Sequence, residues 1–81
     1  MSKSINIEYY AILREQRGLS AEAVESAADT VEALFAELTA EHQFTITPDA
    51  LKVVVNEEFS EWDQALNDGD TVVFIPPVAG G

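Results

Sequence analysis

The 81-residue chain contains no cysteine and a single histidine. The lack of cysteine excludes disulfides, thiolate metal sites, iron–sulfur clusters and a cysteine nucleophile, and it weakly favours a reducing compartment. His42 falls where a helix is expected to end, so we interpret it as a helix-end or surface residue. Without a second histidine or a cysteine, a nucleophile–base pair is hard to assemble, and the sequence predicts no catalytic site of its own.

Basic residues are also scarce, because 4 Lys and Arg stand against 15 Asp and Glu, a formal net charge of -11. Such a surface offers no positive patch to a phosphate backbone or an anionic membrane, so we expect neither nucleic acid nor membrane as a partner. No stretch approaches the roughly 20 apolar residues of a membrane-spanning helix. The first four residues lead into an alternating segment and not into an apolar signal core, which predicts a cytoplasmic protein.

Alternating apolar residues and β-branched residues predict four strands, over residues 4–12, 21–27, 51–55 and 71–75. The second strand has the weakest pattern, because Ala and Glu are poor strand formers. In the last strand, Val72 and Phe74 have the parity of core residues, whereas Val73 and Ile75 face the other side.

One main helix is predicted to begin after Asp29 or Thr30, either of which can act as the N-cap, and to end near His42. A short helical turn is also compatible with the polar connection 13–18. One main helix can cover only one face of a sheet. The order of elements therefore predicts an α+β fold of the β-grasp (ubiquitin-like) type, with a mixed sheet whose first and last strands pair in parallel. Residues 1–75 would form this domain, and residues 76–81 an extended tail.

The segment between the third and last strands is mostly polar. We expect a turn at residues 56–58, followed by a connection with apolar anchors at Phe59, Trp62 and Leu66. Asp68 and Asp70 flank a glycine in the next turn, but their spacing is not that of a calcium loop. We therefore predict two solvated carboxylates there, and no metal site.

The last six residues, Pro76-Pro77-Val78-Ala79-Gly80-Gly81, begin with stiff residues and end without side chains. In an extended form they would reach about 20 Å. The prolines direct the tail away from the sheet, and the glycines remove the bulk that would block a narrow channel. This pattern suits a terminal carboxylate that must enter the active site of another protein. The alternative is an unimportant frayed end, because two terminal glycines occur by chance in roughly one chain in two hundred.

Residues 67–81 closely resemble the C-terminus of the small subunit of molybdopterin synthase, the MoaD type of the MoaD/ThiS sulfur carrier family. Leu13-Arg14-Glu15, residues 30–34 and Val55-Asn56 are also similar to that family. The specific part is the Pro-Pro-Val-x-Gly-Gly end after an Asp-Gly-Asp turn and an apolar strand, since a Gly-Gly end alone is shared with ThiS-type carriers and ubiquitin. The Glu57-Glu58 pair and Ala79 depart from the family pattern, and neither touches the terminal glycines.

The resemblance implies a sulfur carrier that is not an enzyme on its own. A MoeB-type enzyme would use ATP to adenylate the carboxylate of Gly81, and sulfur from a persulfide donor would then convert it to a thiocarboxylate. The tail would enter a MoaE-type large subunit, in a heterotetramer of two small and two large subunits. There the sulfur would pass to cyclic pyranopterin monophosphate. No permanently bound cofactor is implied, only the covalent sulfur on Gly81.

The resemblance also assigns roles to individual residues. Gly81 would carry the reactive carbon and Gly80 would give steric clearance, while the partner interface would contain Arg14, Phe59, Ile75, Pro76, Pro77 and Val78. Phe59 and Ile75 could equally belong to the core, and Arg14 could be a solvated surface residue. Three alternatives to the molybdopterin pathway stay open: a ThiS-like carrier for another sulfur pathway, a ubiquitin-like modifier joined through Gly81, and a plain β-grasp interaction module.

Overall fold

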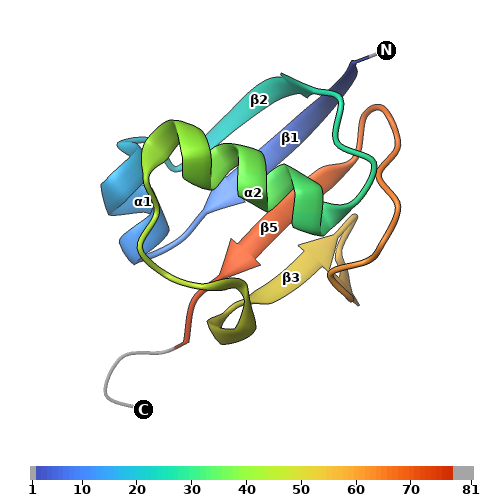
Figure 1. The fold of residues 1–81 in the computed structure, drawn as a ribbon. Coiled ribbons are helices and arrows are strands. Elements are labelled where there is room, and N and C mark those ends of the chain that lie inside the picture. Colours follow the sequence, from blue (N-terminus) through green and yellow to red (C-terminus); the bar gives the residue numbers. More distant parts are fainter. Residues whose placement is uncertain (1, 78–81) are drawn as a thin grey trace.

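A mixed five-stranded sheet carries the long helix α2 on one of its faces (Figure 1). The computed structural model describes residues 2–77. Within them the helical elements are α1 (Ile12–Arg17), α2 (Val31–His42) and the 3-10 turn η1 (Pro48–Ala50). The strands are β1 (Lys3–Tyr9), β2 (Ala21–Ser26), β3 (Lys52–Val55), β4 (Glu58–Ser60) and β5 (Thr71–Ile75).

The strands lie in the order β2-β1-β5-β3-β4. The first and last strands pair in parallel, with Tyr9 opposite Phe74, and the other neighbouring pairs are antiparallel. This arrangement confirms the predicted α+β β-grasp fold, including the weakly patterned strand at β2 and the helical turn at α1.

The core lies between the sheet and α2, because the two apolar surfaces must be removed from water together. Phe35 on the helix and Phe74 on β5 are both buried, and their ring centroids are 5.0 Å apart. Val72 and Phe74 point into the core as their parity predicts. The other fully buried large side chains are Ile5, Ile7, Tyr9, Leu13, Val31 and Leu34.

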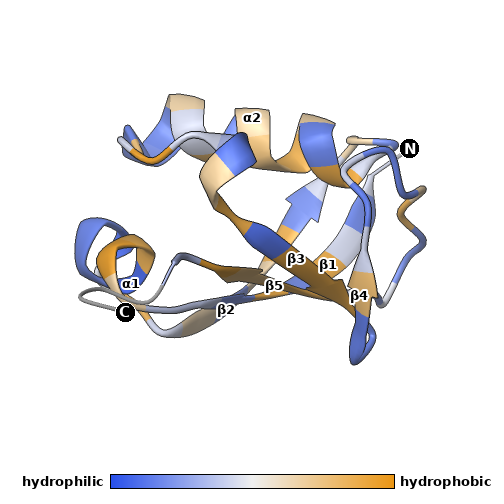
Figure 2. Ribbon diagram, turned by 90° about the horizontal axis from the view of Figure 1, so that it is seen from below, coloured by the Kyte–Doolittle hydropathy of each residue, from blue (hydrophilic) through white to orange (hydrophobic). Residues whose placement is uncertain are grey.

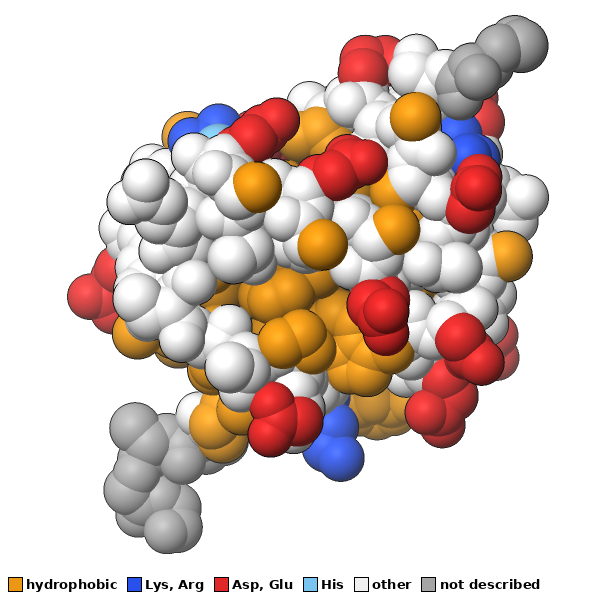
Figure 3. All heavy atoms as spheres, viewed as in Figure 1, with side chains coloured by type: hydrophobic (Ala, Val, Ile, Leu, Met, Phe, Trp, Pro, Cys, Tyr) orange, Lys and Arg blue, Asp and Glu red, His pale blue; other side chains and the backbone are white. Residues whose placement is uncertain are grey.

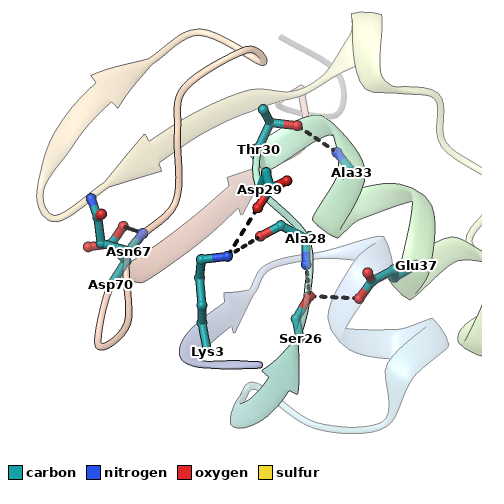
Figure 4. Close-up of polar contacts among 9 residues, drawn as sticks. All are labelled: Lys3, Ser26, Ala28, Asp29, Thr30, Ala33, Glu37, Asn67 and Asp70. Atoms are coloured by element: carbon teal, nitrogen blue, oxygen red, sulfur yellow. Dashed lines mark hydrogen bonds and ion pairs between the residues drawn. The ribbon is translucent and has the colours of Figure 1, made fainter. Parts of the chain in front are cut away.

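Several polar contacts hold the start of α2 over the sheet (Figure 4). Of the two candidate N-caps, Thr30 fills the role, because its hydroxyl accepts a hydrogen bond of 3.2 Å from the N–H of Ala33. The Ser26 hydroxyl at the end of β2 donates to the Glu37 carboxylate on α2 at 2.7 Å. These two contacts satisfy a free N–H of the first turn and fix the helix against the edge of the sheet.

The fifth strand, β4, corrects the sequence-based prediction of a turn over residues 56–58. The turn is limited to Asn56 and Glu57, and Glu58 already pairs with Val55. Both turn residues have positive φ angles, 50° and 72°, as in the two-residue turns that suit the twist of a hairpin. No glycine marks this turn, so the sequence pattern does not predict the short strand after it.

The connection from β4 to β5 contains two of the three expected apolar anchors, whereas Phe59 lies on β4 and is exposed. Leu66 is buried, and Trp62 packs against the core. The carbonyls of Trp62 and Gln64 accept from the N–H groups of Glu32 and Val31, at 2.9 and 3.1 Å. This connection therefore also satisfies free donors at the start of α2.

The turn before β5 corrects a second prediction, because Asp70 is buried and not solvated. Its side chain accepts hydrogen bonds of 2.8 Å from the N–H of Asn67 and from the amide of Asn56. Asp68 is exposed, although its carboxylate accepts from the N–H of Ser4 at 2.7 Å. Both carboxylates therefore order the chain that leads into β5.

A network around Glu22 ties α1 to the sheet. Arg17 makes a two-pronged contact with the Glu22 carboxylate, at 2.7 and 2.8 Å, and the buried Tyr9 hydroxyl donates to it at 2.7 Å. The hydrogen bonds from Arg17 lower the pKa of Glu22, against the opposing effect of partial burial, and Tyr9 adds to the lowering. Burial, together with the hydrogen bond to this carboxylate, raises the pKa of Tyr9.

We predict that Glu57→Gly stabilises the fold by about 1 kcal/mol, because a left-handed backbone costs an L-residue that much and costs glycine little. Glu57→Ala is the matched control, since it removes the same carboxylate and keeps the Cβ. Urea unfolding of the two variants compares their free energies directly. Equal stability of the two variants would contradict the claim of strain at this position.

We predict that Glu22→Gln lowers the free energy of unfolding at pH 7 by about 2 kcal/mol, since it breaks charged hydrogen bonds. A lowered pKa in the folded state means that this stabilisation is present above the unfolded pKa and is lost as the pH falls through the folded value. The native chain should therefore lose stability below about pH 4.5.

The matched control for this change is Glu25→Gln, on the same strand but exposed. Urea unfolding at a series of pH values should show a weaker acid loss for Glu22→Gln than for Glu25→Gln. The same acid dependence in both variants would rule out the Glu22 network as its source.

Candidate functional site

The predicted tail is attached to the middle of the sheet, because β5 lies between β1 and β3. Phe74 fixes the end of this strand in the core, and its ring lies 6.0 Å from that of Trp62. Pro76 is buried and Pro77 is exposed, so the chain reaches the surface at the second proline. Three predicted site residues, Val78, Gly80 and Gly81, lie outside the described residues.

Helix α2 lies on one side of the sheet, and within the described residues no helix covers the opposite face (Figure 2). Phe59 lies opposite Val54, and Val54 lies opposite Val73, so these three side chains form a row across β4, β3 and β5. A hollow of about 340 Å³ beside this row is lined by Tyr10, Val54, Val73 and Ile75. We call Tyr10, Val54, Phe59, Val73 and Ile75 the open-face patch.

The position of Phe59 settles one of the alternatives left open above. Its side chain is 78% exposed, so it does not belong to the core. Ile75 is half-buried and points to the same open face. An exposed apolar cluster of this kind is typical of a protein interface. The contacts of Phe59, Ile75, Pro76 and Pro77 with a partner stay predictions. Pro76 is already buried within this chain, so it holds the start of the tail against the domain.

Sequence reasoning did not name Tyr10, Val54 and Val73 as site residues. The sequence does contain a signal that Val73 faces away from the core, because it has the same strand parity as Ile75. Val54 was hidden in the run Val53-Val54-Val55, where each residue is equally apolar and only the pairing shows which face it takes. Tyr10 lies just beyond β1 and is partly exposed next to the hollow.

The few cations of the chain differ in their surroundings. Lys3 contacts Asp29 at 3.3 Å and Arg17 contacts Glu22, whereas Arg14 and Lys52 make no ion pair within residues 2–77. Arg14 is exposed on α1, and Lys52 lies opposite Ile75. Since β1 and β5 are parallel, α1 and the chain leaving β5 lie beyond the same end of the sheet. Arg14 is thus available to an acidic group on a partner, and this contact stays a prediction.

The described residues offer little for catalysis. His42 is the last residue of α2, as predicted, but its side chain is only 18% exposed and its ring lies 5.8 Å from that of Phe44. Within residues 2–77 no three His, Asp or Glu side chains gather closely enough to hold a metal ion. None of the helices in that part of the chain is long and apolar enough to cross a membrane.

Comparison with known proteins identifies relatives of this chain. The chain is 35% identical to the molybdopterin synthase sulfur carrier subunit of Escherichia coli, over 95% of this chain and 99% of that protein. The fold is similar to that of SAMP1 from Haloferax volcanii, with a TM-score of 0.80, 27% identity, and coverage of 96% of this chain and 99% of that one.

A Pyrococcus furiosus structure, whose name proposes subunit 1 of a molybdopterin converting factor, has a TM-score of 0.79 and 29% identity. The similarity covers 95% of this chain and all of that one. The model of the ThiS family matches residues 7–81, which include both terminal glycines and the whole open-face patch. The chain therefore belongs to the ThiS family.

Proposed function

We propose that this chain is the sulfur carrier subunit of a molybdopterin synthase. The observation that carries the proposal is that the model of the ThiS family matches this chain up to and including Gly81. The last strand, from which the tail starts, lies in the centre of the sheet. The 35% identity to the Escherichia coli carrier over nearly the whole chain supports this choice among the family's pathways.

The proposed chemistry takes place at the carboxylate of Gly81. A MoeB-type partner adenylates this group with ATP, because a free carboxylate resists attack by a nucleophile and the adenylate supplies a leaving group. The outer sulfur of a persulfide donor then attacks the adenylate and displaces AMP, and a thiol that acts as two-electron reductant cleaves the resulting acyl disulfide to leave the thiocarboxylate. The chain has no cysteine, so a side chain cannot hold the transferable sulfur as a persulfide. Gly80 adds no bulk next to the reacting carbon, which suits a narrow active-site channel.

The open-face patch provides the docking surface in this proposal. Its five apolar side chains lie on the face that α2 leaves free, and Ile75 is two residues from Pro77, where the chain reaches the surface. A MoaE-type large subunit that covers the patch would therefore receive the tail beside the docked surface. Exposed aromatic residues such as Phe59 are typical of the residues that dominate interface energies. Sulfur would then pass to cyclic pyranopterin monophosphate in the large subunit.

One observation favours a second function. SAMP1 of Haloferax volcanii, to which the fold is similar, is named as a small archaeal modifier protein. The same activated Gly81 could be attacked by a lysine amine of another protein, which would give an isopeptide bond. Conjugates of higher mass that contain this chain, and that disappear when Gly81 is deleted, would identify this second role.

We predict that the purified chain, mixed with a MoeB-type enzyme, ATP, a persulfide donor and a thiol reductant, gains the mass difference of one sulfur for one oxygen. A variant with one alanine added after Gly81 should gain nothing while keeping its circular dichroism spectrum. Intact-mass spectrometry checks both, with the Escherichia coli carrier as the positive control. Equal loading of the extended variant would contradict the proposed role of the Gly81 carboxylate.

We predict that Phe59→Glu weakens binding to the large subunit by at least about 2 kcal/mol, since it places a charge in the apolar patch. The fold should persist, because Phe59 is exposed. Leu19→Glu is the matched control, as Leu19 is also exposed and apolar but lies outside the patch. Calorimetric titration of the large subunit with both variants tests this. Native affinity for Phe59→Glu would exclude the patch as the docking surface.

A further inference from the structure

A second apolar hollow lies on the opposite side of the molecule, between α2 and the loop that follows it. It measures about 450 Å³, and its floor contains the buried rings of Phe35 and Phe44. Figure 3 shows hydrophobic side chains gathered in the middle of this side, with acidic side chains around them. We call this hollow the α2 groove; its apolar lining consists of Phe35, Ala36, Ala40, Phe44, Ile46 and Pro48.

Hydrogen bonds and ring packing fix the loop that forms one wall of the α2 groove. The side chain of Gln16 on α1 makes two hydrogen bonds to Thr45, at 2.8 and 3.2 Å, and thereby ties the loop to the domain. Phe44 stacks on Phe35 with a centroid distance of 5.9 Å. An occupant would thus find a preformed site, which reduces the ordering cost of binding.

One polar group in the wall of the groove lacks a partner. The hydroxyl of Thr39 is out of solvent, and it is the one side-chain polar atom in residues 2–77 that is buried without a hydrogen bond. Such a group costs about 1–3 kcal/mol. Because Thr39 lines the groove, the backbone of an occupant is a candidate partner for this hydroxyl.

The charges around the groove select the kind of occupant. Glu32 lines the groove itself, and Asp49 directly follows Pro48 of its lining. With a net charge of -11, a second copy of this chain would be repelled, whereas a basic segment would be attracted.

We propose that the α2 groove binds a short segment of a partner protein whose apolar side chains are flanked by Lys or Arg. The apolar side chains fill the groove above Phe35 and Phe44, and the cations face Glu32 and Asp49. The groove and the open-face patch lie on opposite sides of the sheet, so one chain can hold this partner while its open face is docked. This inference does not depend on the sulfur carrier role.

The test is a two-dimensional NMR titration of the isotope-labelled full chain. The probe is a synthetic peptide with Leu and Phe between Lys and Arg, and the control peptide has Glu in place of each basic residue. Ala40→Arg fills the groove at an exposed helix position, and Ala33→Arg is the matched control on the same helix but outside the lining. Arg is a good helix former, so both variants should fold.

We expect the basic peptide to shift the amide signals of Ala36, Thr39, Ala40 and the 44–48 loop. Ala40→Arg should weaken this binding roughly tenfold or more, and Ala33→Arg should leave it near the native value. Phe59→Glu should also leave it unchanged. Four results would each overturn the proposal: no shifts, shifts on the open-face patch instead, equal binding of the acidic peptide, or self-association of the chain through the groove without any peptide.

Discussion

The pairing of β5 with β1 on one edge and β3 on the other is the constraint on which the rest of the structure depends. It places Val72 and Phe74 in the core, and it fixes the point at which the chain leaves the sheet. The parallel half of this pairing joins the two ends of the chain, which a local hairpin cannot do. A tail that starts from this strand therefore has a fixed origin and direction at Pro76, whatever it does beyond the described residues.

A single main helix on a five-stranded sheet leaves one face of the sheet without cover (Figure 2). The open-face patch is the direct consequence, because Val54 on β3 and Val73 and Ile75 on β5 place apolar side chains on this face. The net charge of -11 has the opposite effect, since it discourages contact between copies of the chain. The apolar patch and the negative charge together favour binding to a different protein over binding between copies of this chain. On the other side of the sheet, apolar side chains of α2 and of the loop after it line the α2 groove.

The order of elements along the chain and the core could be predicted from the sequence because their signals are periodic. The stripe on α2 and the alternation in β1 and β5 each repeat often enough to fix a face. The missed features have short or ambiguous signals. β4 has three residues and follows a turn with Glu57 at positive φ, where glycine would be expected. Asp70 resembles any surface carboxylate, and only the fold brings Asn56 to it.

The functional site also has one part that the sequence predicts and other parts that only the fold reveals. The Pro-Pro-Val-Ala-Gly-Gly end could be recognised in the sequence because its chemistry lies in consecutive residues. The open-face patch could not be fully predicted, since Phe59, Val54 and Val73 come from three strands and meet only through strand pairing. The α2 groove had no sequence signal at all, because it depends on the path of the loop that Gln16 holds in place.

Fragmentation mass spectrometry of the chain isolated from its own cells tests the central claim most directly. The account requires that the C-terminal fragment ends at Gly81 and that part of the population carries one sulfur in place of an oxygen on that residue. A fragment that continues past Gly81 in every molecule, or sulfur found on any other residue, would contradict it.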